Sequence, residues 1–108
     1  MDKDITYNGW TNYETWCVNL WMNEEESYYS ELSQNVWDEA KADDIFTKEQ
    51  RAVYNLADML SGKFKQENPL AQNSIYTDLL NAAISSVNWD EIAKNMINNV
   101  KEGMVVNV

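Results

Sequence analysis

Four helix-start signals recur along this 108-residue chain, and they constrain its fold more than any other feature. Each places a Thr or Asn three residues before a Glu or Gln, the spacing at which the two side chains satisfy free backbone N–H groups at a helix N-terminus. The pairs are Thr11 with Glu14, Asn23 with Glu26, Thr47 with Gln50, and Asn88 with Glu91. Apolar residues at helical spacing follow each pair, and no convincing period-2 run occurs. The sequence therefore predicts an all-α fold, a compact single-domain bundle of about five helices.

Residues 8–21 are the expected anchor of this fold because they hold three of the five tryptophans. Asn8 and Gly9 form a turn dipeptide, and a helix is expected to begin at about Asn12. On a 3.6-residue repeat, one stripe that we expect to lie in the core contains Tyr13, Trp16, Cys17, Leu20 and Trp21. This position predicts a buried, unreactive Cys17 thiol, with a reactive thiol as the alternative.

Four further helices are expected downstream. The second runs from a cap at Asn23 to about Ala42, and the third from Thr47 to about Gln66. The fourth follows Pro69 and covers residues 75–87, and the fifth runs from Asn88 to Gly103, which is placed to end it in a left-handed conformation. The expected core residues are Trp16, Leu20, Leu32, Val36, Leu56, Leu60, Leu79, Leu80, Ala83, Ile92 and Met96.

The two ends of the chain are expected to differ from the helices. We expect residues 1–9 to form an irregular segment that leads into the first helix. We expect residues 104–108 to form a short apolar tail. The sequence leaves open whether this tail packs back on the domain, pairs with residues 4–7 or binds a partner.

The composition disfavours most enzyme classes. The chain has no histidine, which removes the commonest general base and the commonest zinc ligand. Its three glycines are isolated from one another, so a Gly-rich phosphate loop is excluded. The eighteen carboxylates form neither an EF-hand loop nor a Glu-x-x-His motif. We therefore expect a protein that is not an enzyme and that carries no metal and no cofactor.

The N-terminus lacks the basic and apolar regions of a secretory signal, and no apolar run approaches the length of a membrane span. A single cysteine cannot form an internal disulfide. These features predict a cytoplasmic protein that does not contact a membrane.

The net charge of −10 is distributed unevenly. Residues 1–47 hold eleven Asp or Glu against Lys3 and Lys41, a net charge of −9, whereas residues 48–108 hold seven against six, a net charge of −1. Glu24, Glu31 and Asp38 recur every seven residues over about 21 Å of the expected second helix. The carboxylates expected to bind a partner are Glu24, Glu25, Glu26, Glu31, Asp38, Glu39, Asp43 and Asp44.

A row of carboxylates is suited to the Lys and Arg groove that a protein uses for its nucleic acid, and electrostatic steering would raise the rate of association. An alternative is that the carboxylates only keep a tryptophan-rich domain soluble. Direct binding to nucleic acid is disfavoured by charge repulsion. A further alternative is a partly exposed aromatic patch around Trp10, Tyr28 and Trp37 that meets a partner. A homodimer formed through such aromatics or the tail also remains open.

Three segments carry a family resemblance: residues 7–16 with Leu20 and Trp21, residues 75–83, and residues 87–93. They resemble a family of small, mostly uncharacterised proteins of bacteriophages and mobile elements, which share an Asn-Gly-Trp-x-Asn-Tyr-Glu-Thr-Trp opening and an Asn-Trp-x-Glu-Ile-Ala motif near the C-terminus. The resemblance implies phage or mobile DNA inside a bacterium, where small acidic proteins often inhibit host defence, among them anti-restriction and anti-CRISPR proteins.

Charge and resemblance together predict an anti-defence inhibitor in the bacterial cytosol. Its partner would be a host immune nuclease or surveillance complex, and its acidic side would block the nucleic-acid groove of that partner. The alternative is a phage accessory module that docks another protein through exposed aromatics, without nucleic-acid mimicry.

Overall fold

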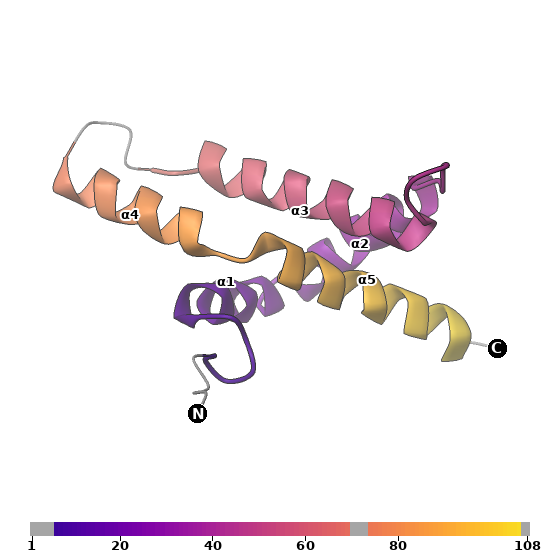
Figure 1. The fold of residues 1–108 in the computed structure, drawn as a ribbon. Coiled ribbons are helices and arrows are strands. Elements are labelled where there is room, and N and C mark those ends of the chain that lie inside the picture. The colour runs from indigo at the N-terminus through magenta and orange to yellow at the C-terminus, as the bar shows by residue number, and fades with distance from the viewer. Residues whose placement is uncertain (1–5, 70–73, 107–108) are drawn as a thin grey trace, which may run out of the picture.

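The chain forms five α-helices over residues 6–69 and 74–106, which are the residues that the structure, a computed structural model, describes. The helices are α1 (Tyr13–Asn23), α2 (Glu26–Glu39), α3 (Lys48–Gln66), α4 (Ile75–Ser86) and α5 (Trp89–Val106). α4 and α5 follow each other along nearly one line, α3 runs back beside them, and α4 extends past the end of α3 (Figure 1). The predicted all-α class is confirmed. None of the described helices combines the length and apolar content that a bilayer crossing requires.

The core lies between α3 and α5, which share the most extensive helix contact, and α2 packs against both. Leu56 and Leu60 of α3 and Ile92 and Ile97 of α5 are fully buried. Val36 of α2 and Met22 of α1 are also buried and extend the same cluster. The rest of the molecule is arranged around this pair of helices.

α3 and α5 begin where the sequence predicts. Thr47 Oγ1 accepts a 3.0 Å hydrogen bond from the Gln50 N–H, and Gln50 Oε1 accepts a 2.9 Å bond from the Thr47 N–H, so the capping box is complete. At α5, Asn88 Oδ1 accepts a 3.0 Å bond from the Glu91 N–H. The predicted Asn8-Gly9 turn is present too, because Tyr7 and Trp10 exchange two backbone hydrogen bonds across it and both turn residues have positive φ.

The predicted cap of α1 and the predicted start of α2 are wrong, whereas α1 begins at Tyr13, close to the predicted start at Asn12. α1 is capped by Asn12, whose Oδ1 accepts a 2.9 Å bond from the Thr15 N–H, while the Thr11 N–H donates instead to Glu91 Oε1. Asn23 is the last residue of α1, and α2 starts after Glu25 with no side-chain cap. Asn and Thr are both good caps, so local sequence could not choose between neighbouring candidates.

The predicted ends of two helices also differ. α2 ends at Glu39 rather than near Ala42. α5 runs through Gly103 to Val106, so Gly103 does not end it. A glycine costs a helix only about 1 kcal/mol, and no proline follows to stop this one. Residues 104–106 therefore continue a helix, whereas residues 107–108 and 1–5 of the predicted tail and lead-in lie outside the described residues.

The apolar stripe of α1 faces solvent, contrary to prediction. Tyr13 is 51%, Leu20 44% and Trp21 69% exposed, and Trp16 and Cys17 are only half-buried. The buried side of α1 carries Thr15 and Met22. α4 behaves in the same way: its predicted core residue Leu79 is 61% exposed, and Leu80 and Ala83 are half-buried. Helical spacing correctly groups residues on one side of a helix, but it does not determine which side meets the core.

Candidate functional site

The predicted partner-binding carboxylates all lie on the surface, and we call them the acidic surface. Two occupy the α1–α2 junction, four lie on α2, and two lie in the loop before α3. In that order they are Glu24, Glu25, Glu26, Glu31, Asp38, Glu39, Asp43 and Asp44, and every one is exposed. Their exposure leaves all eight accessible to solvent, and their binding to a partner stays a prediction.

The expected row of three carboxylates on the second helix is not formed. Glu24 is the C-cap of α1, and the following Glu25 departs from helical geometry at φ −122° and ψ 48°. Only Glu31 and Asp38 then share a side of α2, about 10 Å apart along its axis at 1.5 Å per residue. Asp38 also accepts a 2.9 Å bond from the Gln34 side chain. The acidic surface is thus a broad patch around α2 rather than a straight 21 Å line.

Cations are absent from the helices that carry this surface. Residues 4–40 and 66–93 contain no Lys or Arg, so α1, α2 and α4 carry none. Several cations elsewhere are bound internally: Lys48 donates to the carbonyl oxygens of Trp37 and Ala40, and Lys63 pairs with Glu67 at 2.7 Å. Within the described residues, Asp43 is the one member of the acidic surface in an ion pair. The other seven form no ion pair with a described residue, and Lys41 is the one cation within the same stretch of chain, residues 24–44.

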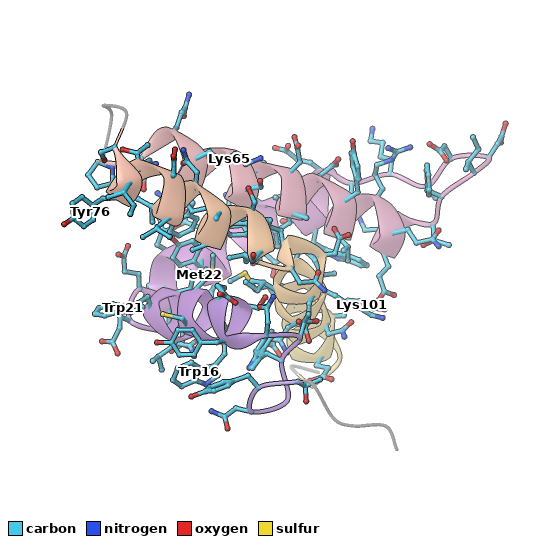
Figure 2. The ribbon with its side chains drawn as sticks, turned by 60° about the vertical axis from the view of Figure 1, so that its left-hand side comes forward. Trp16, Trp21, Met22, Lys65, Tyr76 and Lys101 are labelled. Atoms are coloured by element: carbon cyan, nitrogen blue, oxygen red, sulfur yellow. The ribbon has the colours of Figure 1, made fainter. Side chains whose placement is uncertain are left out.

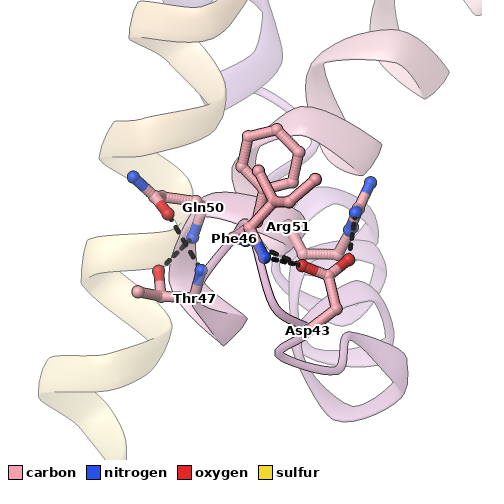
Figure 3. Close-up of polar contacts among 6 residues, drawn as sticks. Asp43, Phe46, Thr47, Gln50 and Arg51 are labelled. Carbon is pink, nitrogen blue, oxygen red and sulfur yellow. Dashed lines mark hydrogen bonds and ion pairs between the residues drawn. The ribbon is translucent and has the colours of Figure 1, made fainter.

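Asp43 has a structural role in the loop between α2 and α3 (Figure 3). Its carboxylate accepts bonds from the backbone N–H groups of Phe46 at 2.7 Å and Ile45 at 2.9 Å, and it pairs with Arg51 at 2.6 Å. These three donors, the two backbone N–H groups foremost, lower the pKa of Asp43 from 3.8 to about 2. Its acceptor positions are occupied by the protein itself, so Asp43 is the member least free to bind a partner.

The three residues of the predicted partly exposed aromatic patch, Trp10, Tyr28 and Trp37, differ in exposure. Trp10 and Trp37 are partly buried against the core, and the Lys48 ammonium lies 4.6 Å from the centre of the Trp37 ring. Tyr28 is the only one of the three among the strongly exposed apolar side chains of the described residues. The exposed aromatics that could anchor a partner are found elsewhere.

Besides Tyr13, whose ring contacts those of Tyr7 and Trp16, five strongly exposed apolar side chains lie on α1 and α4, two helices that contact each other. We call this set the α1/α4 face, and its members are Leu20 (44% exposed), Trp21 (69%), Ile75 (67%), Tyr76 (70%) and Leu79 (61%). Figure 2 shows Trp21 and Tyr76 at the same edge of the molecule, each pointing away from its helix. The sequence pattern grouped these residues, but it assigned them to the core.

Sequence reasoning also missed a polar hollow of about 320 Å³ between α1, α2 and α5. Five of its thirteen lining residues carry amide side chains: Asn19, Asn23, Gln34, Asn95 and Asn99. The available signal was the recurrence of Asn four residues apart on both α1 and α5, since Asn is unfavourable inside helices. In the part of the chain that the structure describes, no group of three or more Asp, Glu or Cys side chains is arranged to hold a metal ion.

Comparison with known proteins gives one match. A family model described as a family of unknown function (DUF7249) covers residues 3–105. No curated protein and no solved structure matches the chain. The resemblance to an uncharacterised family is thereby confirmed, whereas the bacteriophage origin stays a prediction. Because the family model spans nearly the whole sequence, this chain belongs to the DUF7249 family, a family of unknown function.

Proposed function

We propose that this protein inhibits a bacterial defence protein without catalysing a reaction. Its acidic surface would occupy the Lys and Arg groove in which a host nuclease or surveillance complex holds nucleic acid. The phage setting and the bacterial cytosol rest on the resemblance of the opening and closing motifs. The mode of binding rests on charge.

The observation that carries the proposal is the excess of exposed negative charge in residues 24–44, which hold eight carboxylates and one cation, Lys41. Of these eight carboxylates, the seven other than Asp43 form no ion pair with a described residue. Such a surface attracts a cationic groove over about a Debye length, roughly 8–10 Å at physiological salt. Complementary potentials of this kind raise association rates and select partners of opposite charge.

Solubility is the competing explanation, and it makes a different demand on the sequence. Carboxylates anywhere on the surface would keep the domain soluble. Specific binding requires them at defined positions. Reversing the same number of charges at two different places on the surface, in two separate variants, therefore distinguishes the two explanations.

The experiment reverses two charges on α2 and two elsewhere. The Glu31→Lys/Asp38→Lys variant alters the acidic surface, and the matched Asp58→Lys/Glu102→Lys variant alters exposed residues of α3 and α5. Each reversal adds two charges, so both variants go from −10 to −6. Bacteria carrying a restriction or CRISPR system would express each protein and be challenged with phage. We expect protection of the phage by the parent and the control variant, and its loss with the α2 variant.

Equal protection by both variants would reject the acidic surface as the binding site, and a parent that protects no phage would reject the inhibitor itself. Far-ultraviolet circular dichroism and thermal unfolding of both variants confirm that folding is intact. All four substituted side chains are exposed, so these measurements should match the parent.

A further inference from the structure

We propose that the α1/α4 face binds a cationic amphipathic helix of another protein. This goes beyond the inhibition proposed above, because α4 carries no member of the acidic surface. The face offers apolar anchors, whereas the acidic surface offers charge alone.

The α1/α4 face is apolar and uncovered. Three of its members lie on α4, whose only buried residue is Thr77. Monomeric proteins rarely leave a large contiguous apolar patch exposed, and such patches mark interaction sites. Trp and Tyr, which supply two of its five members, are the residues most enriched among interface anchors.

The orientation of α1 is fixed, so its apolar stripe cannot rotate into the core. The Asn12 side chain donates a 2.7 Å bond to the Ser86 carbonyl, and the Asn88 N–H donates a 2.8 Å bond to Thr15 Oγ1. Thr15 is fully buried on the opposite side of the helix from the stripe. A partner would therefore meet a preorganised surface, which lowers the entropic cost of binding.

The charges at the border of this face indicate a basic partner. Glu14 lies two helical turns before Trp21. Glu24 and Glu25 follow Trp21 in the junction between α1 and α2. On α4, Asp78 lies next to Leu79. Among the described cations of α3, Lys63 is paired with Glu67. Lys65 lies above α4 in the view of Figure 2, in which Trp21 lies below α4. An apolar centre with a carboxylate border complements a helix with an apolar stripe between Lys or Arg residues.

The same charges disfavour other occupants. A second copy would bring another net charge of −10 and a like-charged border to the contact. An anionic lipid surface or a nucleic acid would be repelled in the same way. A helix of another protein also fits in length, because the twelve residues of α4 span about 18 Å at 1.5 Å per residue.

The test uses a model peptide of Leu and Lys, about 14 residues and so about 21 Å long as a helix. Its Leu residues repeat at i, i+3, i+4 and i+7 to form one apolar stripe. A scrambled peptide of the same composition has the same charge but no stripe. Fluorescence anisotropy of labelled peptide measures binding to the full chain. We expect the amphipathic peptide to bind at least about tenfold more tightly than the scrambled one.

Two double variants locate the site. Trp21→Gln/Leu79→Gln removes anchors from the α1/α4 face and should weaken amphipathic binding at least about tenfold. Ile45→Gln/Tyr54→Gln removes two equally exposed apolar side chains elsewhere and should leave it unchanged. Equal losses in both variants, or no preference for the amphipathic peptide, would overturn the proposal. A parent dimer that the Trp21/Leu79 variant converts to a monomer in sedimentation would also overturn it, by showing that a second copy covers the face.

The two proposals can fail separately. The Glu31→Lys/Asp38→Lys variant should keep the preference for the amphipathic over the scrambled peptide, even if its attraction to both decreases. Loss of that preference would place the peptide on α2 and contradict the assignment to α1 and α4.

Discussion

Asn12 and Ser86 lie 74 positions apart in the sequence, and the Asn12 amide donates a 2.7 Å hydrogen bond to the Ser86 carbonyl oxygen. The same side chain caps α1 through its Oδ1, which accepts from the Thr15 N–H. One residue thus begins a helix and attaches it to the end of α4. This double contact sets the direction in which the stripe of α1 points.

Replacing Asn12 should therefore destabilise the fold. Asn12→Ala removes the cap of α1 and its bond to the Ser86 carbonyl, and it should cost about 1–2 kcal/mol in the free energy of unfolding. Asn23→Ala, at the position where the sequence predicted a cap that the structure does not form, should change stability by less than about 0.5 kcal/mol. Urea unfolding of the two variants measures both. Equal effects would contradict the assigned cap.

Thr15 provides a second test of the same attachment. Its hydroxyl donates to Asn12 Oδ1 at 2.6 Å and accepts from the Asn88 N–H at 2.8 Å. Thr15→Val keeps the shape but leaves the partly buried Asn88 N–H without its partner, which should cost about 1–3 kcal/mol. Thr15→Ser retains the hydroxyl and should recover much of that loss in thermal unfolding. A valine variant as stable as the serine variant would show that the bond contributes little.

The buried residues of α3 and α5 could be predicted from sequence, because the capping residues and the apolar stripe of each helix indicate the same segment. Both helices are central, so any stripe they carry must be buried. α1 and α4 lie at the edge of the bundle, where one side of a helix remains open. Their stripes have the same spacing as those of central helices, and what turns them outward is a long-range contact such as that of Asn12 with Ser86. Local periodicity contains no information about such a contact.

Two leucines that the sequence placed in the core should therefore behave differently. Leu60 is fully buried and Leu79 is 61% exposed. Leu60→Ala should cost about 2–5 kcal/mol, whereas Leu79→Ala should change stability by no more than about 0.5 kcal/mol. The comparison holds the chemistry constant and varies only burial. A large loss at Leu79 in chemical denaturation would mean that α4 buries its stripe after all.

Asp43, in the loop before α3, should make the stability of the fold depend on pH in the acidic range. Because the pKa of Asp43 is about 2 in the folded chain and 3.8 ordinarily, its ionised form stabilises the fold above about pH 4. That contribution is lost as the pH falls through about 2. Asp43→Asn should therefore flatten the pH dependence of stability between these values, as followed by thermal unfolding in a pH series. A pH dependence as steep in the Asp43→Asn variant as in the parent would contradict this role of the carboxylate.

The candidate site was predictable in composition but not in shape. The partition of charge identified the segment that carries the acidic surface, and the binding of a partner there stays a prediction. Its geometry required the structure, because the break at Glu25 separates Glu24 from α2. The role of Asp43 also depends on backbone N–H groups and Arg51, whose positions follow from the loop conformation.

The most direct test of the inhibitor proposal is competition with DNA for a purified defence protein. A labelled duplex bound to a nuclease or surveillance complex that the parent inhibits in cells would be titrated with each protein. The parent and Asp58→Lys/Glu102→Lys should displace the DNA at similar concentrations. Glu31→Lys/Asp38→Lys should need at least about tenfold more, since like-charge contacts at a basic groove are costly. Displacement by both variants at the same concentration, or a parent that leaves the DNA bound, would contradict the account.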